Sequence, residues 1–135
     1  MHSGTSLHIA VNRKSINVVG TLLKNGADPS LEDNKGMQAI HIAVLSGEVN
    51  IISLLVQHGA NVNALGDKMT PLYIGCRMGN ITVVEVLLKL GANPEVPGKD
   101  GLYPIHLASA KDNGDMIRLL EHYPKPNPNP TLTQL

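Results

Sequence analysis

Histidine is the side chain in this sequence best suited to bind a metal ion or to move a proton, and three histidines recur in the same local sequence pattern. His8, His41 and His106 each follow a leucine or an isoleucine. A zinc ion needs its ligands at about 2.0 Å around a single point. If the segments that carry these histidines stack as layers at roughly 10 Å, the three rings lie in a row. The spacing therefore argues against a shared metal site.

The other residues with chemical potential form no catalytic motif. The sequence holds no glycine-rich phosphate loop, Cys-x-x-Cys pair, His-Glu-x-x-His or Ser-x-x-Lys pattern. Asp112-Asn113-Gly114-Asp115 lacks the alternation and the final glutamate of a calcium loop. We interpret the one cysteine, Cys76, as a small buried residue, with a reactive or regulatory role as the alternative. We predict that the chain is not an enzyme and binds no metal or cofactor.

The elements that must position these residues are short helices, as residues 69–93 illustrate. Thr70 suits a helix N-cap, and Pro71 suits the first helical position, where a missing N–H costs nothing. Gly79 ends this helix, and Gly91 lies just past the end of the next one. One face of the second helix carries Ile81, Val84, Leu87 and Leu88. Such a helix hairpin cannot bury its own apolar faces, so it needs neighbours.

Similar hairpins occur along the chain. The openings are Thr5-Ser6-Leu7-His8, Gln38-Ala39-Ile40-His41, Thr70-Pro71-Leu72-Tyr73 and Tyr103-Pro104-Ile105-His106. The closings are Gly26-Ala27-Asp28, Gly59-Ala60-Asn61 and Gly91-Ala92-Asn93. With steps of 33, 32 and 33 residues, the chain resembles the ankyrin-repeat family over roughly residues 3–123. The resemblance implies an all-α solenoid of stacked helix–turn–helix pairs with protruding β-hairpin-like fingers.

We expect one repeat domain over residues 1–124 and a Pro/Asn-rich tail over 125–135. The repeats span about 3–32, 33–64, 65–97 and 98–124, and the first lacks its leading β-turn arm. In the fourth repeat Glu121 stands where the others carry an aliphatic residue, and Pro124 replaces the closing glycine. A carboxylate at that position predicts a face that meets water, as a terminal cap requires. The tail is either a linker or a strap on the last helix.

The family resemblance also implies details of the turns. The recurring histidine and the threonine three positions earlier are expected to hydrogen-bond the turn, which leaves the third repeat in question because Tyr73 replaces histidine there. The second finger is one residue short, a gap we place between Ala64 and Leu65. It carries Lys68 where the other fingers have glycine, so we expect a different turn or a strained backbone.

Charge and hydropathy exclude several classes of function. Lys plus Arg and Asp plus Glu number 11 each, so electrostatics does not favour nucleic acid or an anionic membrane. No apolar run approaches the ~18 residues of a membrane span. A single cysteine excludes an internal disulfide and suits an intracellular setting, cytoplasmic or nuclear. The motif Asn80-Ile81-Thr82 leaves a secreted origin as the alternative. We expect a monomer.

The family resemblance implies that the array binds a protein or peptide on a concave face, which the finger tips and the exposed sides of the first helices form. We expect the partner to lie across the second to fourth repeats, with an apolar strip at the centre and charged residues at the rim. The predicted contacts are Arg13, Lys35, Met37, Leu45, Asp67, Met69, Arg77, Met78, Lys99, Leu102 and Lys111. Some of the apolar ones could instead be buried against the fingers.

Three functions remain open. The chain is predicted to be a non-catalytic interaction module, such as an adaptor, an inhibitory domain or a substrate-recruiting arm of a larger protein. The alternatives are a structural spacer and a regulatory fragment of an enzyme whose catalytic domain lies elsewhere. Asn63 resembles the asparagine that an oxygen-sensing dioxygenase hydroxylates in ankyrin repeats, so it is a candidate modification site.

Overall fold

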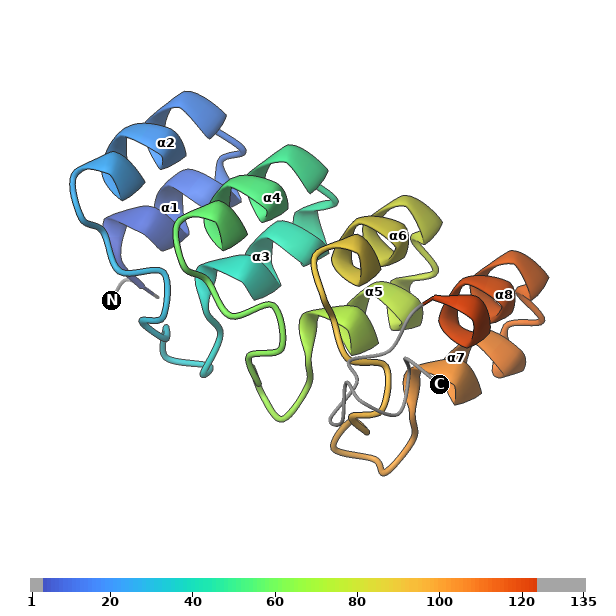
Figure 1. Ribbon diagram of the computed structural model, residues 1–135. Coiled ribbons are helices and arrows are strands. Elements are labelled where there is room, and N and C mark those ends of the chain that lie inside the picture. Colours follow the sequence, from blue (N-terminus) through green and yellow to red (C-terminus); the bar gives the residue numbers. More distant parts are fainter. Residues whose placement is uncertain (1–3, 124–135) are drawn as a thin grey trace, which may run out of the picture.

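The computed structural model describes residues 4–123 as four stacked helix–turn–helix pairs (Figure 1). The helices are α1 Ser6–Asn12, α2 Ile16–Lys24, α3 Ala39–Ser46, α4 Val49–Gln57, α5 Pro71–Met78, α6 Ile81–Lys89, α7 Pro104–Ala110 and α8 Gly114–His122. The odd-numbered helices form one layer and the even-numbered helices the other, while the long loops extend from one side. Each helix packs against its pair mate and its equivalents in adjacent pairs. This confirms the predicted all-α solenoid.

The helix ends use the residues that the sequence pattern indicates. The Thr70 hydroxyl accepts a hydrogen bond from the Tyr73 amide at 3.0 Å, and Pro71 occupies the first position of α5. Gly47 and Gly79 close α3 and α5 with φ of 72° and 75°. That left-handed backbone suits glycine and turns the chain sharply into the next helix. None of these helices exceeds nine residues, and none within residues 4–123 has the length and apolar character that a membrane span requires.

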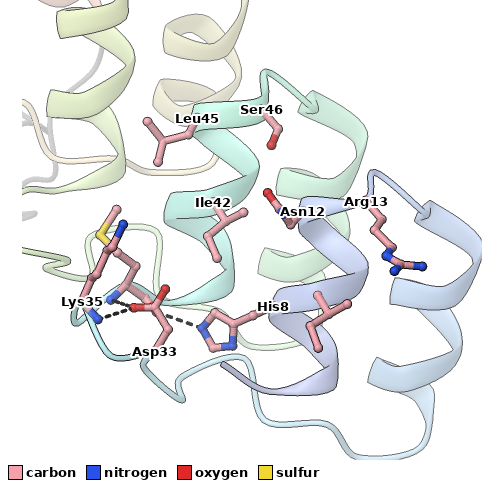
Figure 2. A pocket seen from close by; sticks show the side chains of 10 residues that line it. His8, Asn12, Arg13, Asp33, Lys35, Ile42, Leu45 and Ser46 are labelled. Atoms are coloured by element: carbon pink, nitrogen blue, oxygen red, sulfur yellow. Dashed lines mark hydrogen bonds between the residues drawn. The ribbon is translucent and has the colours of Figure 1, made fainter. Parts of the chain in front are cut away.

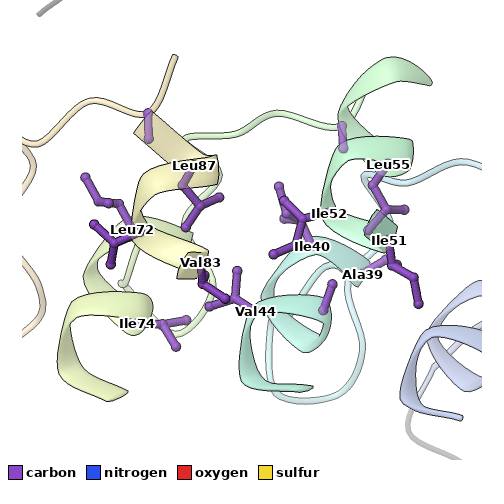
Figure 3. Close-up of a cluster of buried hydrophobic side chains, with 14 of the residues drawn as sticks. Ala39, Ile40, Val44, Ile51, Ile52, Leu55, Leu72, Ile74, Val83 and Leu87 are labelled. Atoms are coloured by element: carbon purple, nitrogen blue, oxygen red, sulfur yellow. The ribbon is translucent and has the colours of Figure 1, made fainter. Parts of the chain in front are cut away.

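The core is a row of aliphatic contacts between the layers. Figure 3 shows Ile40, Ile52 and Leu55 in the second pair. These side chains are inaccessible to solvent, as is Leu87 of α6. Gly75 allows α5 to approach α6, since an added Cβ would lie 3.3 Å from the side chains of Val83 and Val84. The two helices of the third pair are therefore closely fitted to each other.

Two of the recurring histidines join one pair to the next finger. The Thr5 amide donates to His8 Nδ1 at 3.1 Å, and His8 Nε2 lies 2.9 Å from the Met37 carbonyl oxygen. His41 repeats the arrangement with the Gln38 amide at 3.0 Å and the Ala64 carbonyl at 2.8 Å. Because Nδ1 accepts, Nε2 carries the proton and donates to the carbonyl. The predicted structural role of this histidine is confirmed.

Tyr73 replaces that link with a longer one. Its hydroxyl donates to the Asp100 carboxylate of the following finger, with oxygen–oxygen distances of 2.7 and 2.6 Å. Burial of the ring and this hydrogen bond raise the pKa of Tyr73 to about 12. The third pair therefore retains a bond to its neighbour, through a side chain where the first and second pairs use a backbone carbonyl.

The second finger differs from the other two at its tip. Gly66 and Met69 exchange backbone hydrogen bonds of 2.8 and 3.0 Å across a two-residue turn. Both turn residues, Asp67 and Lys68, have positive φ, 51° and 63°. This is the geometry of a type I′ hairpin. Lys68 was expected to have either a different turn or a strained backbone. It has both, because the turn is a two-residue hairpin and its backbone is left-handed.

The position of the gap was predicted wrongly. The Asp33 and Gly98 amides donate to the carbonyls of Met37 and Leu102, respectively, across three turn residues. The Gly66 amide donates to the Met69 carbonyl across only two. The arm that leads from the closing glycine to this bonded residue has the same length in all three fingers. The missing residue therefore lies in the turn and not between Ala64 and Leu65, because a hairpin can lose a turn residue without moving the arm.

At the far end of the array, Glu121 and Ser109 of the last pair are exposed. The predicted exposure of the Glu121 carboxylate is thus confirmed. Expectations for the leading arm at residues 1–3, for Pro124 and for the tail lie outside the described residues.

Candidate binding surface

The fingers and the outer sides of the odd-numbered helices form one surface, here called the finger-side surface. Two hollows lie on it, the first between α1 and α3 and the second between α3 and α5. Met37 and Leu45 line both, so the hollows adjoin each other. They occupy the first to third pairs, one pair earlier than expected for a contact surface.

The first hollow has a volume of about 470 Å³ (Figure 2). Its apolar lining comes from Ile9, Met37, Ile42 and Leu45, and its polar lining from His8, Asn12, Arg13, Asp33, Lys35 and Ser46. Figure 2 shows Leu45 and Ser46 at one end and Asp33 with Lys35 at the other. Asp33 accepts the backbone amides of Lys35 and Met37 at 2.8 and 3.0 Å. These two hydrogen bonds of the Asp33 carboxylate stabilise the turn of the finger.

The second hollow, of about 390 Å³, is more apolar. It is lined by Met37, Leu45, Met69, Ile74, Arg77 and Met78. The one charged group among them is Arg77, whose Nη1 lies 3.6 Å from the Met69 sulfur. The hollow can therefore receive an apolar side chain, with one cation at its edge to orient a polar neighbour.

The expected apolar strip is only partly exposed. Leu45, Met78 and Leu102 are 50%, 45% and 42% exposed. Met37 is half-buried and packs against the core. Met69 is 7% exposed, so the prediction that it stands free on the surface was wrong. It closes the tight second hairpin and has the Arg77 guanidinium beside its sulfur, and these contacts hold it inside the hollow.

The charged residues of this surface divide into two groups. Asp67 and Lys99 pair with each other at 2.8 Å, and that hydrogen bond holds the pKa of Asp67 below its usual value. Arg13, Lys35, Arg77 and Lys111 form no ion pair within residues 4–123. The Asp100 carboxylate accepts from Tyr73, which lowers its pKa. The acids here have partners, and most of the cations do not.

Several predicted contacts lie outside the two hollows. Lys99, Leu102 and Lys111 are exposed but belong to the fourth pair and line neither hollow. Conversely, sequence reasoning missed Ile9, Ile42 and Ile74, which line them. Ile42 and Ile74 each lie three residues before a predicted contact, Leu45 and Arg77, and Ile9 lies four residues before Arg13, so each is one turn back on the same helix face. That spacing was the available signal.

The remaining candidates are engaged in the fold. The Asn63 side-chain oxygen accepts the Asn93 amide at 2.8 Å and so links two successive loops. Hydroxylation of Asn63 stays a prediction. Burial raises the pKa of the Cys76 thiol to about 12, which leaves almost no thiolate near neutral pH. Within residues 4–123 no three His, Cys, Asp or Glu side chains are placed to hold a metal ion.

Comparison with known proteins supports the repeat pattern. The profile of a family described as ankyrin repeats (3 copies) matches residues 7–98, and one described as ankyrin repeats (many copies) matches residues 76–121. The human transient receptor potential cation channel subfamily A member 1 is 32% identical over 121 residues, which cover 88% of this chain and 11% of the channel. The tyrosine-protein kinase HTK16 of Hydra vulgaris is 26% identical over 133 residues, covering 96% of this chain and 18% of the kinase. The chain thus spans a small part of these relatives.

Proposed function

This chain belongs to the ankyrin-repeat family, and we propose that it is a non-catalytic module that binds another protein along its finger-side surface. Repeats of this family generally mediate protein–protein interaction, and they are generally not catalytic. The observation that carries the proposal is the pair of exposed apolar side chains, Leu45 and Met78, on adjacent pairs beside the second hollow. Folding alone does not require apolar side chains there.

The partner is an extended segment that combines an apolar anchor with carboxylates. An apolar side chain entering the second hollow covers Leu45 and Met78, and burying one leucine-sized group is worth roughly 1.5–3 kcal/mol. Methionine adapts its shape to different anchors. Carboxylates on either side of the anchor reach Arg77 and, at the first hollow, Arg13 and Lys35, which have no ion-pair partner within residues 4–123. These cations speed association and fix the direction of the segment.

The chain performs this role as a monomer in a reducing, intracellular compartment. Its one cysteine is buried in the core. Because the chain spans only 11% and 18% of the channel and the kinase, we place it as a recruiting or regulatory part of a longer protein. Lys99, Leu102 and Lys111 stay predicted contacts for a partner long enough to reach the fourth pair.

A binding selection tests the proposal. A library of extended peptides with one leucine or phenylalanine among aspartates and glutamates is selected on the wild type, and affinities are measured by fluorescence anisotropy. The double variant Leu45→Glu/Met78→Glu changes the second hollow. Leu31→Glu/Leu65→Glu is the matched control, because these leucines are also exposed, at 47% and 55%, and line neither hollow.

We expect the hollow variant to lose at least about tenfold in affinity, equivalent to about 1.4 kcal/mol, and the control to stay within about twofold of wild type. Far-ultraviolet circular dichroism verifies that both variants are folded. Equal losses in the two variants would place binding on another surface. Absence of any selected peptide would favour the structural spacer.

A further inference from the structure

We propose that the open side of the first helix pair is a docking surface for a further helix–turn–helix unit of the kind this chain already contains. This surface, here called the N-face, consists of Ser6, Ile9, Ala10, Val18 and Leu22. These residues border a hollow of about 280 Å³ together with Arg13 and Ser15. Ile9 and Arg13 also line the first hollow of the finger-side surface, but the inference does not depend on what binds there.

Val18 gives the clearest evidence, because the chain contains its own comparison. The equivalent residues in the other pairs are Ile51, Val83 and Met116. Those three are 1%, 0% and 0% exposed, whereas Val18 is 51% exposed. All four positions hold a large apolar side chain. The position is built for burial in every pair, and only in the first pair does nothing in residues 4–123 cover it.

The neighbouring positions follow the same rule. Ile9 is 48% exposed, whereas its counterparts Ile42 and Leu107 are half-buried and Ile74 is 3% exposed. Ser6 is exposed, while its counterpart Ala39 is inaccessible. Leu22 is half-buried, although its counterparts Leu55, Leu87 and Leu120 are 0%, 0% and 2% exposed. The N-face is therefore a contiguous apolar surface and not one stray residue.

The contacts between existing pairs identify the occupant. α3 packs on α1 and α4 on α2, and the same two contacts recur at each later junction. In the first pair, the side that faces the second pair carries Leu7, Val11, Val19 and Leu23, none more than 5% exposed. A further unit presenting such an aliphatic side to the N-face would continue an interface that this chain already forms three times.

The opposite end of the array is less apolar, although Ile105 and Ile117, the counterparts of Leu7 and Val19, are half-buried there. Ser109 stands where Val11 and Val44 are buried, and Glu121 stands where Leu23 and Leu88 are buried. Both are exposed, and burying an unpaired carboxylate is costly. A second copy of this chain stacking head to tail would place Glu121 against the N-face. The occupant is therefore a unit with an aliphatic forward side.

The test lengthens the chain by one unit. A copy of residues 5–37 is inserted before Thr5, so that the copied forward side faces the original N-face. Val18→Lys is then made in the original first pair, in both the extended and the unextended chain. Asn17→Lys is the matched control, because Asn17 and its counterparts Asn50, Thr82 and Asp115 are exposed in all four pairs. Thermal unfolding and amide hydrogen exchange of α2 are measured.

We expect the extended chain to melt in one transition at a higher temperature, with exchange in α2 slowed at least about tenfold. Val18→Lys should lower the melting temperature of the extended chain strongly and that of the unextended chain little, and Asn17→Lys should do neither. Separate melting of the added unit, failure of the extended chain to fold, or an equal effect of Val18→Lys in both chains would overturn the proposal. So would dimerisation of the unextended chain that Val18→Lys abolishes, since a second copy would then be the occupant.

Discussion

His41 shows how much of this fold depends on a single neutral ring. It is inaccessible to solvent, and its two nitrogens bond the Gln38 amide and the Ala64 carbonyl. Burial disfavours the charged imidazolium and lowers the pKa of His41 from 6.5, although nearby carbonyls act in the opposite direction. A proton added at Nδ1 would also break the bond from Gln38, because that nitrogen could no longer accept.

This pKa shift predicts that the free energy of unfolding depends on pH. The unfolded chain binds a proton at His41 near pH 6.5, whereas the folded chain does so only at lower pH. Stability is therefore complete above pH 6.5 and falls as the pH drops from there toward the folded pKa. Urea unfolding at about pH 7.5 and about pH 5.5 measures the effect.

The variant His41→Gln should be less stable than wild type at about pH 7.5 and should show a flatter pH dependence. His58→Gln is the control, since His58 is exposed at the end of α4. An unchanged pH dependence in His41→Gln would show that His41 is not responsible. The carboxylates Asp28, Asp67 and Asp100 have pKa values below 3.8 and do not titrate in this range.

At the scale of elements, the second finger combines two successive non-glycine residues with positive φ, whereas Lys14 and Asp112 are single cases between the helices of the first and fourth pairs. Asp67 and Lys68 both have positive φ, which costs a residue with a Cβ roughly 1–2 kcal/mol. The other two fingers need positive φ at one tip residue, and there they use Gly36 and Gly101. Because this turn is one residue shorter, Lys68 takes the positive φ that a glycine has at the end of the turn in the other two fingers.

Lys68→Gly should therefore stabilise the chain. Glycine adopts this backbone without a steric penalty but loses more entropy on folding, so a net gain of about 0.5–1 kcal/mol is expected. Asp-Gly is also a favoured pair for this turn. Lys68→Val should be destabilising instead, because a β-branched residue fits positive φ poorly. Urea unfolding measures both, and a loss of stability in Lys68→Gly would contradict the turn assignment.

Helix packing gives a second prediction at this scale. Leu87→Ala removes a fully buried side chain between two pairs and should cost about 2–5 kcal/mol through the cavity it leaves. Met78→Ala, at a residue 45% exposed, should change stability by no more than about 0.5 kcal/mol. Chemical denaturation of the two variants tests this contrast. A similar loss in both would remove Met78 from the proposed contact surface.

The sequence predicted the elements better than the surface. Thr70 with Pro71 marks a helix start through local bonding alone, and the period near 33 follows from positions that each pair must bury. The burial of Met69 depends on Arg77, eight residues away along the chain, and on the shape of a turn that the sequence does not fix. The hollows likewise arise between pairs, so the sequence of any one pair does not reveal them.

The whole molecule is a one-dimensional array whose stability is the sum of its units and the interfaces between them. Its two ends differ in character. The first pair exposes Ile9 and Val18, whereas the last pair exposes Ser109 and Glu121. An exposed carboxylate is compatible with water, whereas the exposed Ile9 and Val18 side chains lose free energy by staying in contact with it.

This asymmetry leads to a prediction for the tail. Deleting residues 125–135 should leave the array folded, with a melting temperature within about 2 °C of wild type, because Ser109 and Glu121 already expose polar side chains on the last pair. Circular dichroism during heating measures the change. A fall of more than about 8 °C would mean that the segment acts as a strap and contributes at least 1 kcal/mol.

In that case a peptide of residues 125–135, added in excess, should restore part of the loss, and Glu121→Ala would test whether the last helix is its contact. The result decides between a linker and a strap, because only a strap has a bound state to restore.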